Sequence, residues 1–337
     1  VLQGGTGQIS ARQAAANASI PMTVPATTVN KVCLSGLNAI FLADLLIQSG
    51  AAEIVVAGGM ESMTKAPYLL PGAREGYRLG DKSVVDSMMY DGLFCAFDQV
   101  AMGAGTEKYA ASAGLERGPQ DDLAAKSHER AAAAIKEGRF ADEIVNVEVP
   151  QRRGDPIVVD TDEGVRPGTT VESLAALRPA FDKAGNITAG NASQISDGGA
   201  AVVVVSKAVA ERLGAQPLGE IVGYGQVAGP DPSLLTQPSR AINAALESAG
   251  RSIGDVDLFE LNEAFAAVGL ASMADLGISD DVVNVNGGAI ALGHPIGMSG
   301  TRVALTLLHE LKRRGGGLGA AALCGGGGQG DAVLLSV

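Results

Sequence analysis

The stretch that decides the fold runs from Val282 to Gly328 and reads VVNVNGGAIALGHPIGMSGTRVALTLLHELKRRGGGLGAAALCGGGG. It is decisive because the chain carries a second, similar stretch from Thr27 to Gly59, TTVNKVCLSGLNAIFLADLLIQSGAAEIVVAGG. Each has a short β-branched run, a Ser-Gly pair, an apolar helical segment with a glycine stop, and an apolar strand that ends in glycines. Self-similarity of this kind predicts two structurally related halves.

The repeated segments predict buried helices and fully covered strands. The helical segments, residues 37–49 and 301–314, carry apolar residues on most of their faces near the start, which is typical of a buried helix. The strand segments, EIVVAGG at 53–59 and GAAALCGG at 319–326, are continuous apolar runs. Such runs predict strands in a sheet that is covered on both faces.

An insertion interrupts the first copy. The second copy continues directly into a strand at 330–337, GDAVLLSV, whose counterpart in the first copy is GGAAVVVVSK at 198–207. The intervening residues are richer in charge, methionine and aromatic side chains, and they include a predicted surface helix at 120–138. We therefore divide the chain into a first half, residues 1–60 plus 197–212, an inserted domain, residues 61–196, and a second half, residues 213–337.

The second half is longer at its start than the first half. It contains a strand near 218–229, a helix near 239–250, a strand at 257–262 and the helix that follows. The first half begins with VLQGGTGQISARQAAANASI, residues 1–20, which matches the strand at 257–262 and its helix. Nothing in the first half corresponds to Leu218–Asp257. The repeat therefore predicts that a strand and a helix, within roughly 40–55 further residues, precede Val1 in the natural protein.

Composition excludes several classes of protein. The 337 residues are 46% hydrophobic and carry a net charge of −12, which argues against a nucleic-acid surface because phosphate binding needs a positive field. No apolar run reaches the ~18 residues of a membrane span, and no signal-peptide pattern is visible. Three scattered cysteines without a CxxC pair predict neither a disulfide framework nor a metal site. We expect a cytoplasmic protein, with a targeting segment upstream of Val1 left open.

A glycine-rich motif near the C-terminus, CGGGGQG, satisfies GxGxxG at Gly325, Gly327 and Gly330. A dinucleotide-binding fingerprint needs a strand before it and a helix after it. Here the residues that follow, DAVLLSV, predict a strand. The motif therefore argues against a dinucleotide cofactor.

Two cysteines are candidates for chemistry, each with a structural alternative. Cys33 lies just before a helix that starts near Ser35, and a helix N-terminus lowers the pKa of a thiol. The alternative is a buried structural cysteine, the commoner fate of a free thiol. Cys324 ends a buried strand and precedes four glycines, whose N–H groups can approach a ligand closely. Its alternative is a core cysteine before a tight turn.

A histidine and an asparagine complete the candidates. His294 lies in the loop of the second copy that is equivalent to the loop of Cys33. Equivalent loops of related halves can meet at the carboxyl ends of their sheets, although a lone histidine is more often structural. Asn262 stands at a strand end before an apolar helix, where it can cap the helix or hold a catalytic water. Structural roles alone are predicted for His128, His309 and Cys95.

Taken together, these blocks resemble the thiolase family, the acetyl-CoA C-acetyltransferases. The resemblance spans essentially the whole chain and is carried by VCLSG around Cys33, VVAGGMESM at Val55–Met63, RPAFDKAGNITAGNASQISDGGAA at Arg178–Ala201, NEAFA from Asn262, NVNGGAIALGHPIGMSG from Asn284 and CGGGGQG from Cys324. It implies a five-layered αβαβα fold with two pseudo-twofold-related halves and an inserted loop domain that covers coenzyme A. It also implies a further N-terminal strand and helix.

The resemblance implies a role for each candidate. Cys33 resembles the nucleophile that accepts the acyl group, while His294 takes its proton and, with a water held by Asn262, forms one oxyanion hole. Cys324 resembles the acid/base that deprotonates the second acetyl-CoA. The backbone N–H groups of Cys33 and Gly326 form the second oxyanion hole. These roles suit the chemistry, because a neutral thiol needs a base and each thioester oxyanion needs oriented donors.

The resemblance also implies the substrate contacts and the assembly. The residues that match positions contacting coenzyme A or its pantetheine arm are Leu93, Met102, Arg166, Ser173, Ala180, Phe181, Ala189, Ser193 and Phe265. Ala101 departs from the biosynthetic subgroup, in which a histidine commonly precedes this methionine. Acyl-CoA substrates are expected, with no permanently bound cofactor and no metal. A homodimer is implied, and the Pro71–Lys82 segment resembles the loop that joins two dimers into a homotetramer.

The expected activity is the reversible condensation of two acetyl-CoA molecules to acetoacetyl-CoA, or the CoA-dependent cleavage of a 3-ketoacyl-CoA, through an acyl-cysteine intermediate. One alternative is a longer-chain thiolase of β-oxidation. Another is a decarboxylating ketoacyl synthase, which uses a cysteine with two histidines, whereas Asn262 fills the second histidine position here. A third is a non-catalytic acyl-CoA or lipid carrier, against which the intact set of candidates argues. Neither nucleic-acid nor membrane partners are expected.

Overall fold

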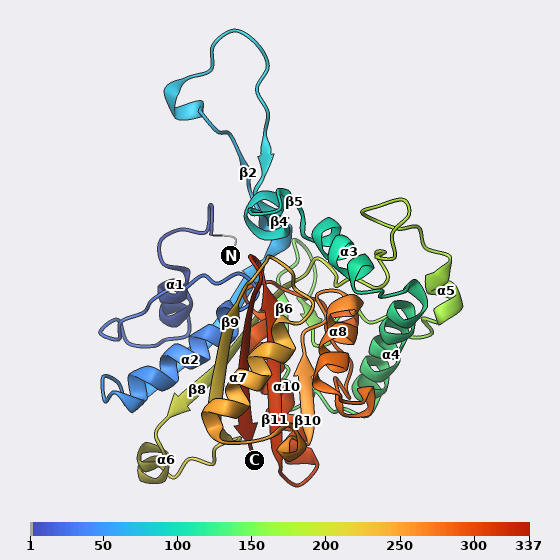
Figure 1. Ribbon diagram of the computed structural model, residues 1–337. Coiled ribbons are helices and arrows are strands. Elements are labelled where there is room, and N and C mark those ends of the chain that lie inside the picture. The colour runs from blue at the N-terminus through green and yellow to red at the C-terminus, as the bar shows by residue number, and fades with distance from the viewer. Residues whose placement is uncertain (1–2) are drawn as a thin grey trace.

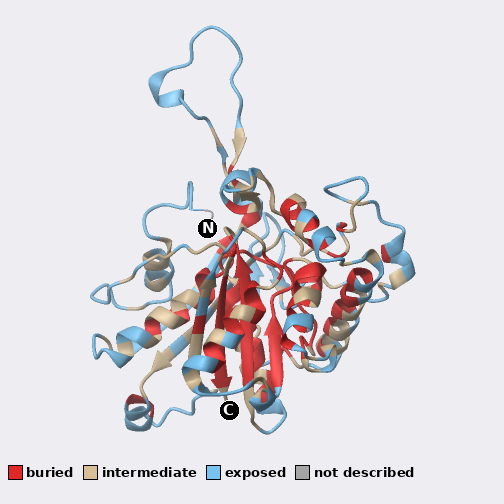
Figure 2. Cartoon of the chain, in the orientation of Figure 1, coloured by how far each residue is buried: buried red, intermediate tan, exposed pale blue. Residues whose placement is uncertain are grey.

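The centre of the molecule is a four-stranded sheet built from the second half of the chain. The computed structural model describes residues 3–337. The strands of this sheet are β9 (Glu220–Ala228), β10 (Leu258–Leu261), β11 (Leu318–Gly325) and β12 (Gln329–Ser336). They lie in the order β10-β11-β12-β9, with β10 parallel to β11 and the other pairs antiparallel. Nearly every residue of β11 and β12 is buried, as their continuous apolar sequences predict (Figure 2).

The first half contributes a shorter sheet with the same local topology. Strand β1 (Ile54–Ser62) pairs antiparallel with β8 (Asp197–Val205), although the whole insertion separates them in sequence. The pairing repeats that of β11 with β12, which follow one another directly. The predicted equivalence of residues 198–207 with 330–337 is therefore confirmed.

Two helices, one from each half, lie between the sheets. Helix α2 (Ser35–Gln48) contacts β1 and β8 on one side and β12 on the other. Helix α10 (Ser299–Arg313) contacts β10 and β11 as well as β1 and β8. Helices α7 (Gln237–Ala249) and α8 (Ala266–Leu276) pack on the opposite face of the four-stranded sheet. The predicted layered α/β arrangement with two related halves is present (Figure 1).

The repeated Ser-Gly pairs mark the point where α2 and α10 cross. A Cβ atom on Gly36 would lie 2.7 Å from the backbone nitrogen of Thr301, and one on Gly300 would lie 2.3 Å from that of Leu37. Only glycine allows the two helix N-termini to approach this closely. The same glycine in each half thus brings the loops that precede the two helices together.

The prediction that both strand segments are covered on both faces is wrong for β1. Val56 on β1 is 53% exposed and Val203 on β8 is 64% exposed, whereas the alternate residue Ala57 is buried. Helices α2 and α10 cover one face of this two-stranded sheet, and the other face is open in the single chain. Helix α2 is buried at its start, as predicted, but Leu45 and Leu46 near its end are exposed.

The start of the chain differs from its predicted counterpart. Residues 1 and 2 lie outside the described residues, and residues 3–9 form turns where the repeat predicts a strand. Helix α1 (Ser10–Asn17) follows, as the repeat with α8 predicts. Within the described part of the first half, β9 and α7 have no counterpart.

The insertion carries three α-helices, a π-helix and three small antiparallel pairs of strands, joined by long loops. Its elements are β2 (Tyr68–Leu69), β3 (Val85–Asp86), a π-helix (Met88–Leu93), β4 (Phe94–Cys95), β5 (Val100–Ala101), α3 (Met102–Ser112), α4 (Arg117–Lys136), β6 (Val147–Val149), β7 (Ile157–Val159) and α5 (Val171–Ala175). The segment between β2 and β3 extends away from the rest of the chain (Figure 1). The predicted surface helix is α4, which buries one face against α8 and α9. The remaining elements are α6 (Lys207–Leu213), α9 (Ala289–Leu292) and 3₁₀ turns at Met63–Lys65, Ala73–Glu75, Ile253–Asp255 and Asp280–Val282.

Candidate active site

Cys33 occupies a tight turn at the start of α2. The residue before it, Val32, has a φ of 52°, in the left-handed region that a β-branched residue rarely adopts. Ser35 holds this turn, because its Oγ accepts from the backbone nitrogen of Lys31 at 2.8 Å and donates to the carbonyl of Val32 at 2.7 Å. Strained backbone of this kind is found where a side chain must be aimed. The turn places Cys33, which is 5% exposed, two residues before the helix.

The surroundings of Cys33 favour the neutral thiol. Burial raises the pKa of Cys33 to about 12, and the backbone N–H groups of Cys33 itself and of Gly326, which lie against the sulfur, act in the opposite direction. The carboxylate of Glu61 raises the pKa further. Because the thiol keeps its proton at neutral pH, a nucleophilic Cys33 needs a base. The two N–H groups are those that the resemblance assigns to an oxyanion hole.

Cys324 lies beside Cys33, although it comes from the other half of the chain. It stands near the end of β11, and the glycines after it form a turn in which Gly327 and Gly328 have φ values of 81° and 68°. Burial raises the pKa of Cys324 above its usual range, and the neighbouring Cys33 raises it further. Strand β12 follows at Gln329, so the GxGxxG motif has no helix after it, as predicted.

His294 and Asn262 meet in the same region. Asn262 Nδ2 lies 3.4 Å from His294 Nε2, and His294 Nδ1 lies 2.6 Å from Ser299 Oγ. Burial, and then the positive charge of Arg302, lower the pKa of His294 to about 4. The imidazole is therefore neutral at pH 7 and can accept a proton. All three hydrogen-bonding side chains are buried.

The helix-capping interpretation of Asn262 is wrong. Helix α8 begins at Ala266 and its N-cap is Phe265, so Asn262 stands three residues further upstream. Its backbone nitrogen donates to the carbonyl of Ala322 on β11, which fixes it at the end of the sheet. Its Oδ1 is buried and finds no hydrogen-bond partner among residues 3–337. An ordered water commonly satisfies such a group.

Several residues that support the candidate site were not predicted from the sequence. Glu61 on β1 accepts from the backbone nitrogen of Gly297 at 3.0 Å and so ties the His294 loop to the first half. Arg302 on α10 pairs with Glu260 on β10 at 3.3 Å. A buried carboxylate or guanidinium leaves no periodic trace in a sequence. For Ser299 a signal existed, since it belongs to the repeated Ser-Gly pair.

Some of the predicted substrate contacts gather around the two cysteines. Leu93 packs in the small cluster that contains Cys33, and Met102 and Phe265 pack in the cluster that contains Cys324. Phe181 lies edge-on to Phe265, with ring centroids 6.4 Å apart. These residues come from the insertion and from the start of α8, so both parts of the chain line the same region.

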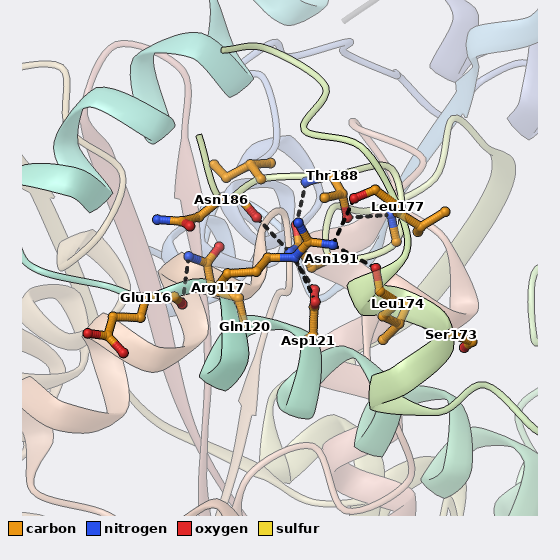
Figure 3. A network of polar contacts seen from close by, with 12 residues as sticks. Glu116, Arg117, Gln120, Asp121, Ser173, Leu174, Leu177, Asn186, Thr188 and Asn191 are labelled. Carbon is orange, nitrogen blue, oxygen red and sulfur yellow. Dashed lines mark hydrogen bonds and ion pairs between the residues drawn. The ribbon is translucent and has the colours of Figure 1, made fainter. Parts of the chain in front are cut away.

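The other predicted contacts lie in a segment that α4 anchors. Asp121 on α4 accepts from Arg117 Nε at 2.6 Å and from Asn191 Nδ2 at 2.9 Å, and Asn191 Oδ1 accepts from the backbone nitrogen of Thr188 (Figure 3). This network holds the loop that carries Ala180, Ala189 and Ser193. The backbone nitrogen of Ser193 donates to the carbonyl of Ala264, beside Phe265.

Arg166 and Ser173 make hydrogen bonds to other residues of the insertion. The backbone nitrogen of Arg166 donates to His128 Nδ1 at 3.2 Å, so His128 supports a predicted contact residue. Ser173 forms a capping box with Thr170 at the start of α5. Both predicted contacts are thus held by local hydrogen bonds within the insertion.

A small cavity of about 20 Å³ lies next to the glycine turn after Cys324. Its walls include Met102, Tyr109, Leu234 and Gly327. Among residues 3–337, no cluster of three or more His, Cys, Asp or Glu side chains is arranged to hold a metal ion. In the same part of the chain, no helix combines the length and apolar character needed to span a bilayer.

Known proteins match this chain along nearly its whole length. Residues 1–208 match the family described as "Thiolase, N-terminal domain", and residues 215–337 match "Thiolase, C-terminal domain". A "Probable acetyl-CoA acetyltransferase" of Mycolicibacterium smegmatis is 57% identical over 335 residues, which is 99% of this chain and 86% of the relative. An "Acetyl-CoA acetyltransferase" of Pseudomonas aeruginosa is 53% identical over 337 residues, 100% of this chain and 86% of the relative.

The fold is matched equally well. The crystal structure of the Bacillus anthracis acetyl-CoA acetyltransferase superposes with a TM-score of 0.96 at 42% sequence identity, covering 99% of this chain and 84% of that one. The predicted fold class is thereby confirmed. With both family domains matched in order and relatives above 50% identity over nearly the full length, this chain belongs to the thiolase family.

Proposed function

We propose that this thiolase is an acetyl-CoA C-acetyltransferase that interconverts two acetyl-CoA molecules with acetoacetyl-CoA and coenzyme A. The observation that supports the proposal is the placement of Cys324 beside Cys33 and of Asn262 3.4 Å from His294, with Ile296 of the His294 loop packed against Cys33. Relatives named acetyl-CoA acetyltransferase, 50–57% identical over 99–100% of this chain, support the choice of substrate.

In the first half-reaction, His294 takes the proton of Cys33 as the sulfur attacks the carbonyl of acetyl-CoA. An acetyl thioester forms on Cys33, and coenzyme A leaves with the proton that His294 returns. The imidazole suits the task because its lowered pKa leaves it neutral. The N–H groups of Cys33 and Gly326, which lie against the Cys33 sulfur, would donate to the developing oxyanion, and one such donor contributes about 10²–10³ in rate.

In the second half-reaction, Cys324 gives its thiol proton to His294 and, as the thiolate, removes a proton from the methyl group of another acetyl-CoA. The resulting enolate attacks the acetyl group on Cys33, the new carbon–carbon bond forms, and the Cys33 sulfur leaves with the proton that His294 holds. His294 and a water held by Asn262 stabilise the enolate oxygen. The buried, unpartnered Oδ1 of Asn262 and its Nδ2 near His294 support this assignment. Two acid/base groups of different character suit two different proton transfers.

We propose that residues 61–196 form a loop domain that covers coenzyme A, between a first half of 1–60 plus 197–212 and a second half of 213–337. Leu93, Met102 and Phe265 would contact the pantetheine arm near the cysteines. The remaining contacts proposed are Arg166, Ser173, Ala180, Phe181, Ala189 and Ser193. No cofactor stays bound between turnovers. A homodimer is proposed, joined into a homotetramer through the exposed Pro71–Lys82 segment, in a cytoplasmic setting.

A thiolysis assay across 3-ketoacyl-CoA chain lengths from C4 to C16, with 2-methyl substrates included, tests the proposal. The expected result is a maximum of kcat/KM at acetoacetyl-CoA. A maximum at C8 or longer would instead indicate a longer-chain thiolase. Absence of CoA-dependent cleavage at every length, in a folded protein, would contradict a catalytic function.

A further inference from the structure

Ser299 holds the ring nitrogen of His294 that faces away from Asn262. It is the first residue of α10 and is fully buried. Its Oγ lies 2.6 Å from His294 Nδ1 and 2.9 Å from the carbonyl oxygen of Pro295. A serine hydroxyl has one proton to donate and two lone pairs that accept. If its proton goes to the carbonyl, which can only accept, the oxygen must accept from the imidazole.

The other side of the ring favours the same arrangement. A neutral imidazole carries one proton, on either Nδ1 or Nε2. With the proton on Nδ1, Nε2 presents a lone pair toward the Asn262 amide nitrogen 3.4 Å away and accepts a hydrogen from it. With the proton on Nε2, two donors face each other in a buried site, which is unfavourable because neither can find water. The contacts of Ser299 and Asn262 therefore select one tautomer.

The repeat shows that this use of serine is specific to the second half. The equivalent residue at the start of α2 is Ser35, whose Oγ also donates to a preceding carbonyl, that of Val32. As an acceptor, however, the Ser35 oxygen takes a hydrogen bond from the backbone nitrogen of Lys31 and not from a ring nitrogen. The same hydroxyl at the same helix start thus shapes a turn in one half and holds an imidazole in the other.

We propose that Ser299 is a positioning residue that fixes His294 in the Nδ1–H tautomer, leaving the Nε2 lone pair free to take the proton of Cys33. The proposal rests on the proposed function of His294 as the base. It assigns the tautomer through geometry alone, so it can be tested without turnover. The hydroxyl acts through the imidazole and needs no contact with substrate.

The direct test is the protonation state of the His294 ring in the full-length protein. The chain has three histidines, so ring-¹⁵N-histidine labelling gives a simple long-range ¹H–¹⁵N spectrum, with His294 assigned by its loss in His294→Asn. At pH 8 the expected pattern is a protonated Nδ1 and a bare Nε2. In Ser299→Ala, the Nε2–H form should become populated. A wild-type pattern with protonated Nε2 would overturn the proposal.

Kinetics provide a second, independent readout. In Ser299→Ala, acetylation of Cys33 by acetyl-CoA should slow about 10–100-fold while KM changes less than about threefold, because only a proton transfer is impaired. The matched control is Thr301→Val on the same helix, whose Oγ1 is buried and has no partner among residues 3–337. This control should acetylate at the wild-type rate. Equal rates for Ser299→Ala and wild type would contradict the role of Ser299.

The two readouts separate this inference from the proposed function. If Cys33 becomes acetylated but the wild-type ring carries its proton on Nε2, the thiolase assignment survives and the tautomer assignment fails. If the tautomer pattern is as expected but no acetyl group is transferred, the proposed function fails.

Discussion

At the scale of single residues, the site combines a thiol and an imidazole that are both kept neutral. Burial raises the pKa of Cys33 to about 12 and lowers that of His294 to about 4. A preformed thiolate–imidazolium pair would require the opposite shifts. The proton of Cys33 therefore moves only when the sulfur attacks, and the protein stores the reactive pair in its neutral form.

This neutrality predicts how Cys33 reacts with iodoacetamide, which alkylates thiolates. The second-order rate constant at Cys33, followed by peptide mapping, should rise steadily from pH 7 to pH 9, because the thiolate fraction grows up to about tenfold per pH unit below the pKa. Cys33→Ser identifies the background at the other cysteines. A rate that is already flat between pH 6 and pH 9 would indicate an ion pair and contradict the neutral site.

His294 also predicts a direction for stability. Its pKa is lowered from the usual 6.5 to about 4, so the folded state binds fewer protons than the unfolded chain between these values. The contribution is fully present above pH 6.5 and is lost as the pH falls toward 4. In urea titrations, His294→Asn should lose less stability than wild type between pH 6.5 and pH 4.5. An equal loss in both proteins would refute this.

At the scale of elements, the crossing of α2 and α10 organises the site, because the helix starts carry the loops of Cys33 and His294. Gly300→Ala should destabilise the protein by about 1–3 kcal/mol, since the new Cβ would lie 2.3 Å from the backbone nitrogen of Leu37. Gly118→Ala near the start of α4 is the control, because nothing lies within 4 Å of its Cβ position. Urea unfolding should show no loss there. A similar loss of stability in both variants would contradict the close approach of α2 and α10 at Gly300.

Glu260 on β10 lies beside Arg302 on α10, and its shifted pKa predicts how the stability of the protein changes with pH. Burial raises the pKa of Glu260 to about 8, with Arg302 opposing the rise and Glu143 adding to it. The folded state thus holds more protons than the unfolded chain between pH 4.5 and 8, and stability falls as the pH rises through this range. As the pH rises through this range, the free energy of unfolding of Glu260→Gln should increase relative to that of the wild type by up to about 1.4 kcal/mol per pH unit. Parallel pH profiles of urea unfolding would contradict this.

The sequence revealed elements well where periodicity and repetition agreed. Strands β11 and β12 are almost entirely buried, as their uninterrupted apolar runs predicted, and helix α10 is buried at its start and along one face. The same pattern misled for β1, since Val56 is exposed on a sheet of only two strands. A run of valines records that a residue is apolar, but not whether anything covers it.

The residues of the site were harder to judge than the elements. Asn262 looked like a helix cap, because a sequence does not show that α8 begins only at Ala266. Before the repeat aligned their loops, a structural role was as good an interpretation for Cys33 and a better one for His294. Ser299 was marked by the repeated Ser-Gly pair, but its hydrogen bond to the His294 ring depends on the fold of the loop. Site residues that are far apart in the sequence can be recognised as a group only when the fold brings the two halves together.

At the scale of the whole molecule, the open face of β1 and β8 predicts association. Exposed Val56 and Val203 lie on one face of a two-stranded sheet, and such a patch is usually covered by another chain. Light scattering at micromolar concentration should give a dimer or a tetramer. Deleting residues 71–82 should convert a tetramer to a dimer without changing the near-UV circular dichroism. A monomeric protein would contradict this arrangement.

The central claim is that Cys33, and not Cys324, carries the acyl group, and one measurement tests it directly. Each protein is mixed with acetyl-CoA, quenched in acid and examined by mass spectrometry with peptide mapping. Wild type and Cys324→Ser should each gain about 42 Da, one acetyl group, on the peptide containing Cys33. Cys33→Ser should gain nothing, because a hydroxyl is far less acidic than a thiol and His294 alone does not compensate. An acetyl group found on Cys324 while Cys33 stays free would reverse the two roles and contradict the account.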